Sequence, residues 1–599
     1  MLYKGSVQIK KVDSFTSTPR PQPQASPLEA LDDTGKFINW RQARTLLISS
    51  TGFFTDAYDI FIINLVTPML GYIYYKDDHN QMPSGIQGPF KGMVSFGQLV
   101  GQLTFGFLGD AFGRKSIYGL ELLLIIIATI NCATSASAVE GVGAVGFLGF
   151  WRFILGIGIG GDYPMSSTVA SEWASTHNRG TMIAFIFSMQ GVGQIVAALV
   201  TMILLAIFKG AVEDNVDNLD YVWRLCIGLG CIPAVATIYG RWTMPESPRY
   251  TVNVQHDSEG APAAIAATET FRAKNRPCVS TPNLDDEEKS TTHEQRDQQQ
   301  DDFVVVAQPE TPVSNAPTSM IEYAESQSHL SGNNREPENA SLASEKTVTT
   351  IHDENVLQPQ KQRKTQKEIR RENIRDFVQH FRKWKNLKVL LGVSLCWFFM
   401  DIAFYGTNLN QALILSSMGF APTDLGAWDT LFKQALGNLI LAGLGSFPGY
   451  IMSVLTIERL GRKPIQFMGF LMVGALYIVL GAGWEPIQDA SVALFIVIFA
   501  ISQFFFNFGP NVTTFVLPAE VFPTRHRAKA HGIASASGKL GAIIATFAFN
   551  ALADVGGPPG KRHFLPYVLI IFGVIMLISV IFTHWVPETK GRPLSDFES

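Results

Sequence analysis

Seven ionisable side chains lie inside segments of the sequence that are otherwise apolar. A charged group at the centre of a bilayer costs at least about 2.5–3.5 kcal/mol, so each is by default a candidate functional residue. A buried carboxyl group can take up and release protons, and a buried cation can hold an anion. The seven candidates are Asp56, Asp59, Glu121, Arg152, Asp162, Asp401 and Lys539.

Acidic side chains outnumber basic ones in this set. Five are acidic and two are basic, which gives a net charge of −3 when all seven are ionised. An anion would be repelled by that charge, and protonation of two or three carboxylates removes the repulsion. The set therefore favours an anion that moves together with protons, provided that the substrate is an anion. For each residue the alternative is a structural ion pair or a side chain at the end of a span.

Hydrogen-bonding side chains accompany these charges. The segment WFFMDIAFY places Trp397, Asp401 and Tyr405 four residues apart, which puts them along one face of a helix. The indole N–H, the phenol O–H and a protonated carboxyl group are all donors, so this face could bind an anion. Lys539 lies among small residues, where a cation has few partners except an anion or a carboxylate. Two further amides in apolar segments are Gln190 and Asn511.

Long apolar segments carry these residues. The chain has 599 residues, of which 47% are hydrophobic and 16% are charged, whereas soluble domains have about 25% charged residues. A membrane span needs about 20 mostly apolar residues. We therefore predict an all-α membrane protein with twelve transmembrane helices in two six-helix bundles. The expected spans are 45–74, 89–111, 116–136, 145–169, 181–208, 222–243, 387–411, 430–457, 464–484, 490–515, 528–553 and 564–586.

A long polar segment separates the two sets of spans. It is rich in Gln, Ser, Glu and Asn, so it cannot bury enough apolar surface to fold alone. Its last part, at about 366–385, is predicted to form an amphipathic surface helix, and its Ser and Thr residues are potential targets for kinases. The predicted domains are a tail at 1–40, bundles at 41–244 and 387–587, a largely disordered loop at 245–386 and a tail at 588–599.

The basic residues predict the orientation of the chain. Lys and Arg cluster in the even-numbered loops and in the C-terminal tail, including the stretch 241–249. The odd-numbered loops hold few, namely Lys76, Lys91, Lys209 and the pair Lys561 and Arg562. By the positive-inside rule, both termini and the central loop are expected in the cytoplasm. As a separate expectation, the membrane is the plasma membrane.

The sequence contains an internal repeat with an offset of 348 residues. The tripeptide GRK at 113–115 recurs at 461–463, and Glu172 recurs as Glu520. Two motifs with one offset indicate a duplicated six-helix unit. Transporters of this kind place the substrate at the interface between the repeats.

Several motifs resemble those of a known family. The segments GDAFGRK (109–115), PESPR (245–249) and PETKGR (587–592) resemble signatures of the major facilitator superfamily, in the branch shared with sugar porters. The segment GGDYPMSSTVASE (160–172) is similar to the signature of the phosphate:proton symporter family of fungi and plants. The resemblance covers all twelve spans but not the tails or the central loop. It implies a transporter in a lipid bilayer that imports inorganic phosphate with protons by alternating access, without a cofactor.

The resemblance also implies roles for single residues. Gating residues at the GRK loops would be Asp110, Arg114 and Arg462. Residues around the phosphate would be Tyr163, Gln190, Trp397, Asp401, Tyr405 and Lys539, with Asn511 added because the repeat aligns it with Tyr163. Residues for proton movement would be Asp56, Asp59, Glu121, Arg152 and Asp162. Pro164 removes a backbone hydrogen bond and is expected to bend the helix beside them.

Other functions remain as alternatives. A sugar site would have little use for a lysine opposite Asp401, an organic phosphate such as a glycerophosphodiester would need a larger pocket, and a phosphate sensor would not need the carboxylates of a proton path. The glycines of GIGIGG (156–161) follow no strand, so they do not indicate a dinucleotide loop. We expect no enzyme, because the sequence shows no nucleophile paired with a base and no cluster of metal ligands. We expect no nucleic-acid partner either.

Overall fold

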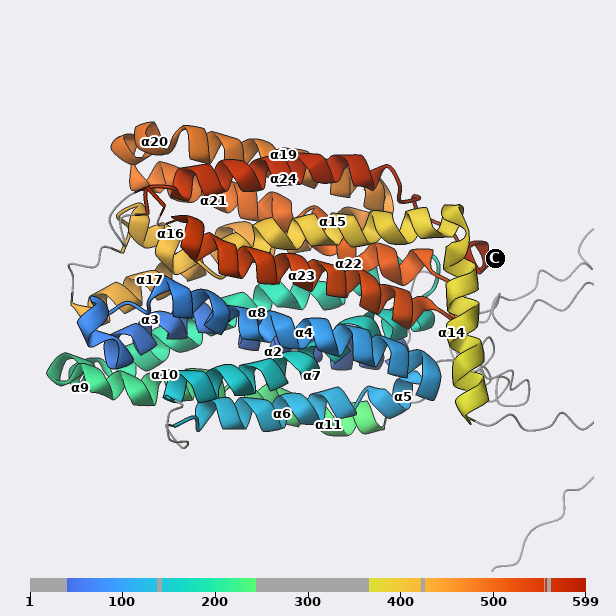
Figure 1. The fold of residues 1–599 in the computed structure, drawn as a ribbon, viewed down its shortest axis with the longest axis horizontal. Coiled ribbons are helices and arrows are strands. Elements are labelled where there is room, and N and C mark those ends of the chain that lie inside the picture. The colour runs from blue at the N-terminus through green and yellow to red at the C-terminus, as the bar shows by residue number, and fades with distance from the viewer. Residues whose placement is uncertain are drawn as a thin grey trace, which may run out of the picture. The chain divides into compact units, whose positions relative to one another are not determined.

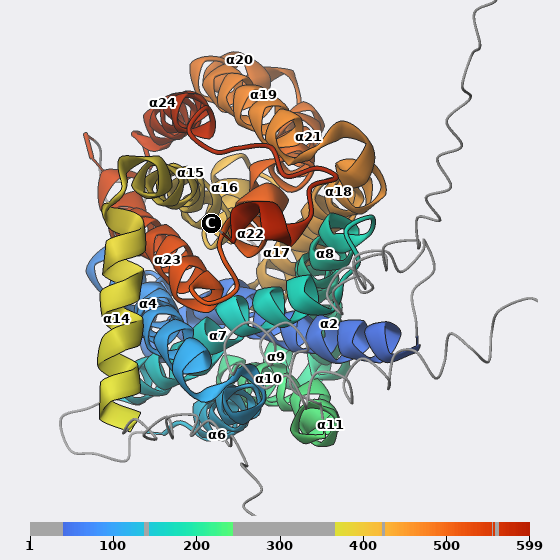
Figure 2. The same ribbon diagram turned by 90° about the vertical axis from the view of Figure 1, so that its right-hand side faces the viewer.

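A computed structural model describes residues 40–136, 143–243, 366–421, 426–553, 555–556 and 562–598. The N-terminal tail and most of the central loop therefore lie outside the described residues. The regular elements of the described ranges are all helical. They run side by side as a bundle in Figure 1, and the view along their axes in Figure 2 separates the helices of the first half from those of the second.

The first half of the chain forms six helical passes. Short helices η1 (Lys76–Asp78), α9 (Lys209–Asp214) and η2 (Val216–Asn218) lie between them. The passes are α2 (Trp40–Phe61) with α3 (Ile63–Tyr74), α4 (Ser84–Phe112), α5 (Arg114–Ile117) with α6 (Leu120–Ala133), α7 (Ala144–Trp173), α8 (Arg179–Ile207), and α10 (Leu219–Gly228) with α11 (Cys231–Trp242).

The second half also forms six passes. They are α15 (Trp384–Asn408), α17 (Ala427–Leu441) with η3 (Ala442–Ser446) and α18 (Phe447–Leu460), α19 (Arg462–Ala482), α21 (Val492–Asn507) with α22 (Pro510–Val521), α23 (Arg527–Ala553) and α24 (Leu565–Thr583). The remaining elements are α14 (Gln366–Arg382), α16 (Gln411–Ser417), α20 (Trp484–Ala490) and η4 (Leu594–Phe597).

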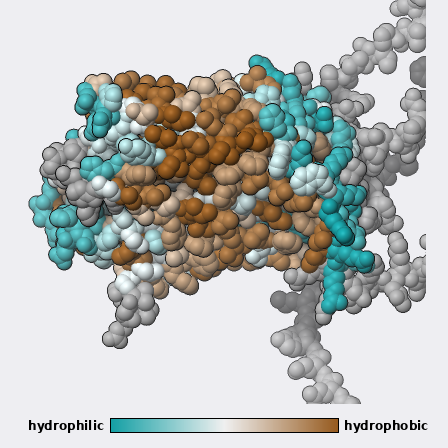
Figure 3. Space-filling model, turned by 45° about the horizontal axis from the view of Figure 1, so that its top comes forward, coloured by the Kyte–Doolittle hydropathy of each residue, from teal (hydrophilic) through white to brown (hydrophobic). Residues whose placement is uncertain are grey.

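Length and composition of these passes fit a membrane. Ten of the described helical runs are long and apolar enough to cross a bilayer. Helix α4, with 29 residues, and helix α6, preceded by α5, complete the twelve. Apolar side chains form a band around the middle of the face in Figure 3, with polar residues at both ends. The predicted all-α membrane fold with twelve helices is confirmed, and a helix is present within the expected range 366–385 as α14.

Glycine allows the helices of this bundle to approach closely. A Cβ atom on Gly97 would lie 2.0 Å from the carbonyl oxygen of Phe153, and one on Gly156 would lie 2.2 Å from that of Val94. A larger side chain at either position would therefore push α4 and α7 apart. The glycines of GIGIGG serve helix packing, which is a common use of small residues in membrane proteins.

The repeat is visible in the backbone. Gly113 and Gly461, the glycines of the two GRK motifs, both have positive φ angles, of 91° and 95°. Only glycine adopts such angles without strain, and each marks the break between two consecutive helices. The two halves thus make the same turn at equivalent places.

Candidate functional site

A buried lysine lies where the two halves of the bundle meet. Lys539, on α23, donates hydrogen bonds to Asp401 Oδ2 at 3.0 Å and to the hydroxyl of Tyr405 at 2.7 Å. Its Nζ also lies 5.2 Å from the ring centre of Tyr163, which belongs to α7 of the first half. All four side chains are at most 2% exposed. The structure therefore brings these four predicted ligands into one enclosed cluster.

Asp401 and Tyr405 share one face of α15, as their helical spacing in the sequence predicted. Asp401 and Tyr405 are one turn apart on α15 and both reach Lys539. Trp397, one turn earlier, lies against Gly538, where an added Cβ would be only 2.5 Å from the indole. The small residue before Lys539 is what lets α23 come close enough for the ammonium group to reach α15.

A second polar cluster lies beside the first and also joins the halves. Gln190 Oε1 accepts hydrogen bonds from the Tyr450 hydroxyl at 2.5 Å and from Asn511 Nδ2 at 3.2 Å. The ring of Phe187 connects the clusters, since its centre is 6.4 Å from that of Tyr163 and 6.2 Å from that of Tyr450. Gln190 and Asn511 were predicted from the sequence, whereas Tyr450 was missed. A tyrosine in the middle of an apolar span was the available signal.

His531 was also missed. This histidine is fully buried on α23, and its ring nitrogens lie 3.2 and 3.3 Å from the Ser167 hydroxyl. Its ring lies 5.6 Å from that of Trp397, centre to centre. It therefore lines the same region as the predicted ligands. Its partner Ser167 is one helical turn beyond Tyr163 on α7.

An arginine joins two of the predicted proton-coupling residues. Arg241, at the end of α11, is 2.6 Å from Asp162 Oδ2 and 3.3 Å from Glu121 Oε1. The other oxygen of Asp162 accepts a hydrogen bond from Ser166 at 2.5 Å. Assigning Arg241 to a loop was wrong, because it belongs to α11 and its side chain is fully buried. The count of two buried bases was correspondingly too low.

Two other predicted acids have few partners. The carboxyl group of Asp56 lies beside that of Asp162, with which it can form a hydrogen bond only when one of the two is protonated, and Arg241 is a further charged neighbour. The Asp59 carboxylate accepts one hydrogen bond, from the Thr129 hydroxyl at 3.2 Å. The guanidinium of Arg152 donates to the backbone carbonyl of Asp59, at 3.4 Å, and not to the carboxylate. A buried carboxylate without partners is costly when charged. Asp56 and Asp59 are therefore places where a proton could reside.

The two repeats build matching ionic clusters at the end of the bundle nearest α14. The first-half cluster consists of Asp110, Arg114 and Glu172, in which Arg114 NH2 lies 3.2 Å from Asp110 and 3.1 Å from Glu172. The second-half cluster consists of Glu458, Arg462 and Glu520, in which Arg462 lies 2.7 Å from Glu458 and 2.8 Å from Glu520. The three predicted gating residues all belong to these clusters.

Each cluster also binds the opposite half of the chain. Asp110 accepts a hydrogen bond at 3.0 Å from the backbone N–H of Lys529, in the first turn of α23. Glu458 accepts bonds at 2.8 and 3.2 Å from the N–H groups of Gly180 and Thr181, in the first turn of α8. An acid at a helix N-terminus is favourable because free N–H groups and the helix dipole meet it there. The two clusters thus hold this end of the bundle closed.

Helix α14 lies across the same end (Figure 1). Asp376 on this helix pairs with Arg525 at 3.0 Å, and Phe377 packs against Phe107 of α4. His526 Nε2 is 3.3 Å from Asp376, but burial and the nearby Arg525 lower the pKa of His526 to about 3. The histidine is therefore neutral near neutral pH, and α14 is held by the Arg525 ion pair and by aromatic packing.

The opposite end is closed by fewer bonds. Lys91, on α4, donates to the carbonyl oxygen of Leu409 at 2.7 Å and to Asn410 Oδ1 at 3.3 Å. Asn64 donates to Asn438 at 2.8 Å. Assigning Lys91 to a loop was wrong, because it is 3% exposed and lies in the first turns of α4. With both ends closed, the cluster around Lys539 is enclosed between them.

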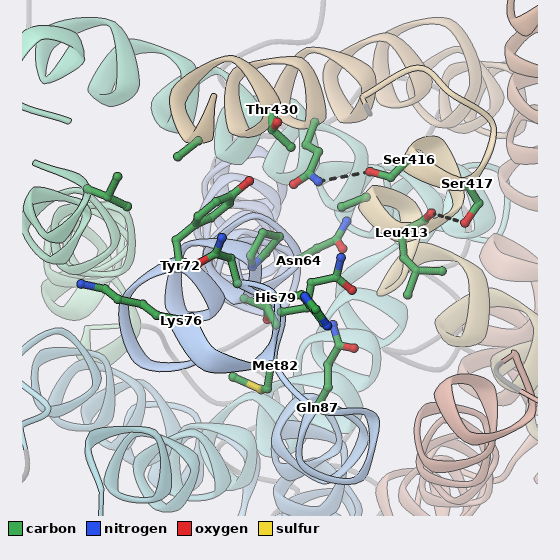
Figure 4. A pocket seen from close by; sticks show the side chains of 18 of the residues that line it. Asn64, Tyr72, Lys76, His79, Met82, Gln87, Leu413, Ser416, Ser417 and Thr430 are labelled. Atoms are coloured by element: carbon green, nitrogen blue, oxygen red, sulfur yellow. Dashed lines mark hydrogen bonds between the residues drawn. The ribbon is translucent and has the colours of Figure 1, made fainter. Parts of the chain in front are cut away.

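A cavity of about 980 Å³ opens at this second end. Its walls come from both halves, and Figure 4 shows Asn64 and Tyr72 of α3 arranged around it together with Ser416 of α16 and Thr430 of α17. None of the predicted phosphate or proton residues lines it.

The sequence profile described as "Sugar (and other) transporter" matches residues 45–306 and 325–599. The chain belongs to this family. It is 36% identical to a protein of Neurospora crassa named repressible high-affinity phosphate permease, over 93% of this chain and 86% of that protein. It is 37% identical to the inorganic phosphate transporter PHO84 of Saccharomyces cerevisiae, over 95% and 86%.

A plant relative and a solved structure extend the likeness. The low affinity inorganic phosphate transporter 4 of Medicago truncatula is 34% identical over 95% of this chain and 93% of its own length. The proton:xylose symporter XylE, solved with a bound glucose derivative, superposes with a TM-score of 0.63 at 18% identity, over 94% of this chain and 99% of that one. The latter identity supports the major facilitator fold alone.

Proposed function

We propose that the protein imports inorganic phosphate together with protons by alternating access. The observation that carries the proposal is the buried cluster of Lys539, Asp401, Tyr405 and Tyr163, which joins the halves between two closed ends. The names of the relatives support phosphate as the substrate. In this proposal the anion sits beside Lys539, and the two ends of the bundle open in turn.

The enclosed cluster favours a small substrate. Each of its side chains is at most 2% exposed, and its possible donors are Lys539 and two tyrosines. The neighbouring cluster adds the amide of Asn511. Inorganic phosphate is compact and accepts bonds on all sides. A glycerophosphodiester would need room for two organic groups, and a sugar would leave the charge of Lys539 without a use.

The carboxyl groups of the first half are proposed to carry the coupling protons. Asp162 shares Arg241 with Glu121, and the carboxyl group of Asp56 lies beside that of Asp162. A proton on Asp162 breaks its ion pair with Arg241 and leaves the arginine to Glu121. The region next to the phosphate then becomes less negative, which favours the bound anion. Loss of the proton on the other side restores the ion pair and favours release.

The α14 end is proposed to face the cytoplasm of a cell and the bilayer to be the plasma membrane. The positive-inside rule supports the orientation, since Arg and Lys crowd α14 and the GRK turns. The two ionic clusters would then be the cytoplasmic gate. The cavity at the opposite end would face the outside, from which phosphate arrives.

Uptake of radiolabelled phosphate into proteoliposomes tests the proposal. Purified protein should accumulate phosphate when the outside is more acidic than the inside, and should only equilibrate it when the pH is equal. Vesicles with Lys539→Ala protein serve as the matched control. Accumulation that is the same with and without the pH gradient would refute proton coupling. If a glycerophosphodiester inhibits uptake more strongly than unlabelled phosphate does, the substrate is an organic phosphate.

A further inference from the structure

Lys91 is a buried cation without a carboxylate partner. Its ammonium group bonds to one backbone carbonyl and one amide oxygen, both of the second half. No acidic side chain of the described residues forms a salt bridge with it, whereas Lys539 is paired with Asp401. A buried charge that has only neutral partners is costly. Its charge is available to a ligand.

The cavity at this end gives such a ligand access. Lys91 lines it together with two other cations, Lys76 and Arg562, and with one acid, Asp214. The charge of Lys76 is already used in a salt bridge with Asp217 at 2.5 Å. Arg562 is only partly buried. Lys91, which is 3% exposed, is therefore the buried cation of this cavity that forms no salt bridge with an acid of the described residues. The cavity fits an anion better than a neutral or cationic molecule.

We propose that this cavity is an entry site for phosphate, in which Lys91 binds the anion before it reaches the cluster around Lys539. This inference rests on the proposed function. An anion attracts the ammonium group by its full charge, whereas the carbonyl of Leu409 and the amide oxygen of Asn410 offer only dipoles. Phosphate in the cavity therefore draws Lys91 away from Leu409 and Asn410. Because those two bonds connect the halves, arrival of the anion also loosens the outer end.

The same charge raises the local concentration of the anion. Clefts lined by one sign of charge increase association rates, and salt weakens this effect. Lys91 should therefore matter most when external phosphate is scarce and ionic strength is low. A lysine that only stabilised the fold would not change the salt dependence of uptake.

Kinetics of uptake in cells without phosphate transporters of their own test the entry site. Lys91→Gln should raise the apparent KM for external phosphate at least fivefold and should flatten its dependence on ionic strength. Lys91→Arg keeps the charge and should change KM less than twofold. Lys433→Gln, which removes an exposed cation of α17 that does not line the cavity, is the matched control and should also change KM less than twofold.

A second variant separates charge from folding. Lys91→Cys should show the same raised KM, and external 2-aminoethyl methanethiosulfonate, which attaches an ammonium group to the thiol, should restore most of the affinity. The sulfonatoethyl reagent, which attaches an anion, should not restore it. Wild-type protein treated with each reagent shows whether the native cysteines contribute. High-affinity phosphate binding by the purified Lys91→Gln protein should stay within twofold of the wild type, because the central cluster is unchanged.

The outcomes distinguish this inference from the proposed function. If the wild type takes up no phosphate, the proposed function fails. If the wild type takes up phosphate and Lys91→Gln has the same KM and salt dependence, the entry site is wrong. If both thiol reagents restore uptake equally, Lys91 fills space and its charge has no role, which also overturns the inference.

Discussion

The two repeats agree at the α14 end of the bundle and differ at its centre. With the offset of 348 residues, Asp110, Arg114 and Glu172 correspond to Glu458, Arg462 and Glu520, and each set makes the same contacts. At the centre, Lys539 corresponds to Gly191, and Asp401 corresponds to Phe53. The same duplication has kept one region symmetric and let the other diverge.

The difference follows from what each region has to do. The α14 end must close both halves against each other, and two equal clusters that each cap a helix of the opposite half do this with the same chemistry twice. The centre, as proposed, must bind an anion and handle protons separately. The acids of the proposed proton path are in the first half, and the lysine proposed to hold the anion is in the second.

The largest effect is expected from Asp162→Asn. The amide is nearly the same size as the carboxyl group, and Arg241 keeps Glu121 as a partner, so the protein should remain folded. The amide cannot release a proton, so accumulation of phosphate driven by a pH gradient should be abolished. Proteoliposome uptake with and without the gradient measures this. Accumulation equal to that of the wild type would show that Asp162 carries no coupling proton.

A smaller but large effect is expected from Lys539→Ala. The variant removes the cation of the cluster and leaves Asp401 and the tyrosines, so the apparent dissociation constant for phosphate should rise tenfold or more, which is about 1.4 kcal/mol. Asp401→Asn is the matched control. Its amide can still donate to phosphate, so binding should partly survive while exchange slows. Equilibrium binding and counterflow on both purified variants give the answer, and wild-type affinity in Lys539→Ala would place the phosphate elsewhere.

Loss of one carboxylate from either ionic cluster should open the α14 end more often, but the size of the effect should differ between the clusters. Glu458→Gln weakens two bonds to backbone N–H groups and two contacts to Arg462, whereas Asp110→Asn weakens one of each. A hydrogen bond to a charged group contributes about 1.5–3 kcal/mol. Both variants should therefore open the α14 end more often, with Glu458→Gln the stronger.

Thiol labelling measures that opening. Ser167→Cys, in protein whose native cysteines have been replaced, puts a buried thiol between the central cluster and the α14 end. A membrane-impermeant reagent should label it several-fold faster with Glu458→Gln, and less so with Asp110→Asn. Equal labelling in both variants and in the parent would mean that the clusters do not control this end.

The residues of the central cluster were predicted from the sequence better than their partners were. Spacing and burial were enough for Asp401, Tyr405 and Lys539, because a charge in an apolar helix stands out and the helical period fixes which residues share a face. Arg241 and Lys91 were missed because each lies near the end of its helix. There a long side chain can extend either to the interface or into the bundle, and packing by neighbouring helices decides which. Tyr450 and His531 were missed because neither carries a fixed charge.

The fold shows the same limit. Twelve apolar windows predicted twelve passes, and the repeat predicted two matching turns at Gly113 and Gly461. Acids of one half bind the N-terminal N–H groups of α8 and α23 in the other half. These contacts could not be predicted, because they depend on how two surfaces meet in three dimensions. They leave no periodic trace along the chain.

The smallest effect is expected from the segment that has no counterpart in the repeat. Replacing residues 255–360, which lie outside the described residues, by a short flexible linker should change the KM and maximal rate of phosphate uptake less than twofold. The physical reason is that α14 is held by its own contacts: Asp376 pairs with Arg525 and Phe377 packs on Phe107. These contacts do not depend on what precedes the helix, and His526 beside them stays neutral from pH 5 to 8 because its pKa is about 3.

A matched control is the same deletion with Asp376→Ala, which should alter uptake more than the deletion alone. If the deletion by itself abolishes uptake while the protein still inserts and binds phosphate, the central loop takes part in the transport cycle, and the contrast between two repeats would have to include a third, unrepeated element.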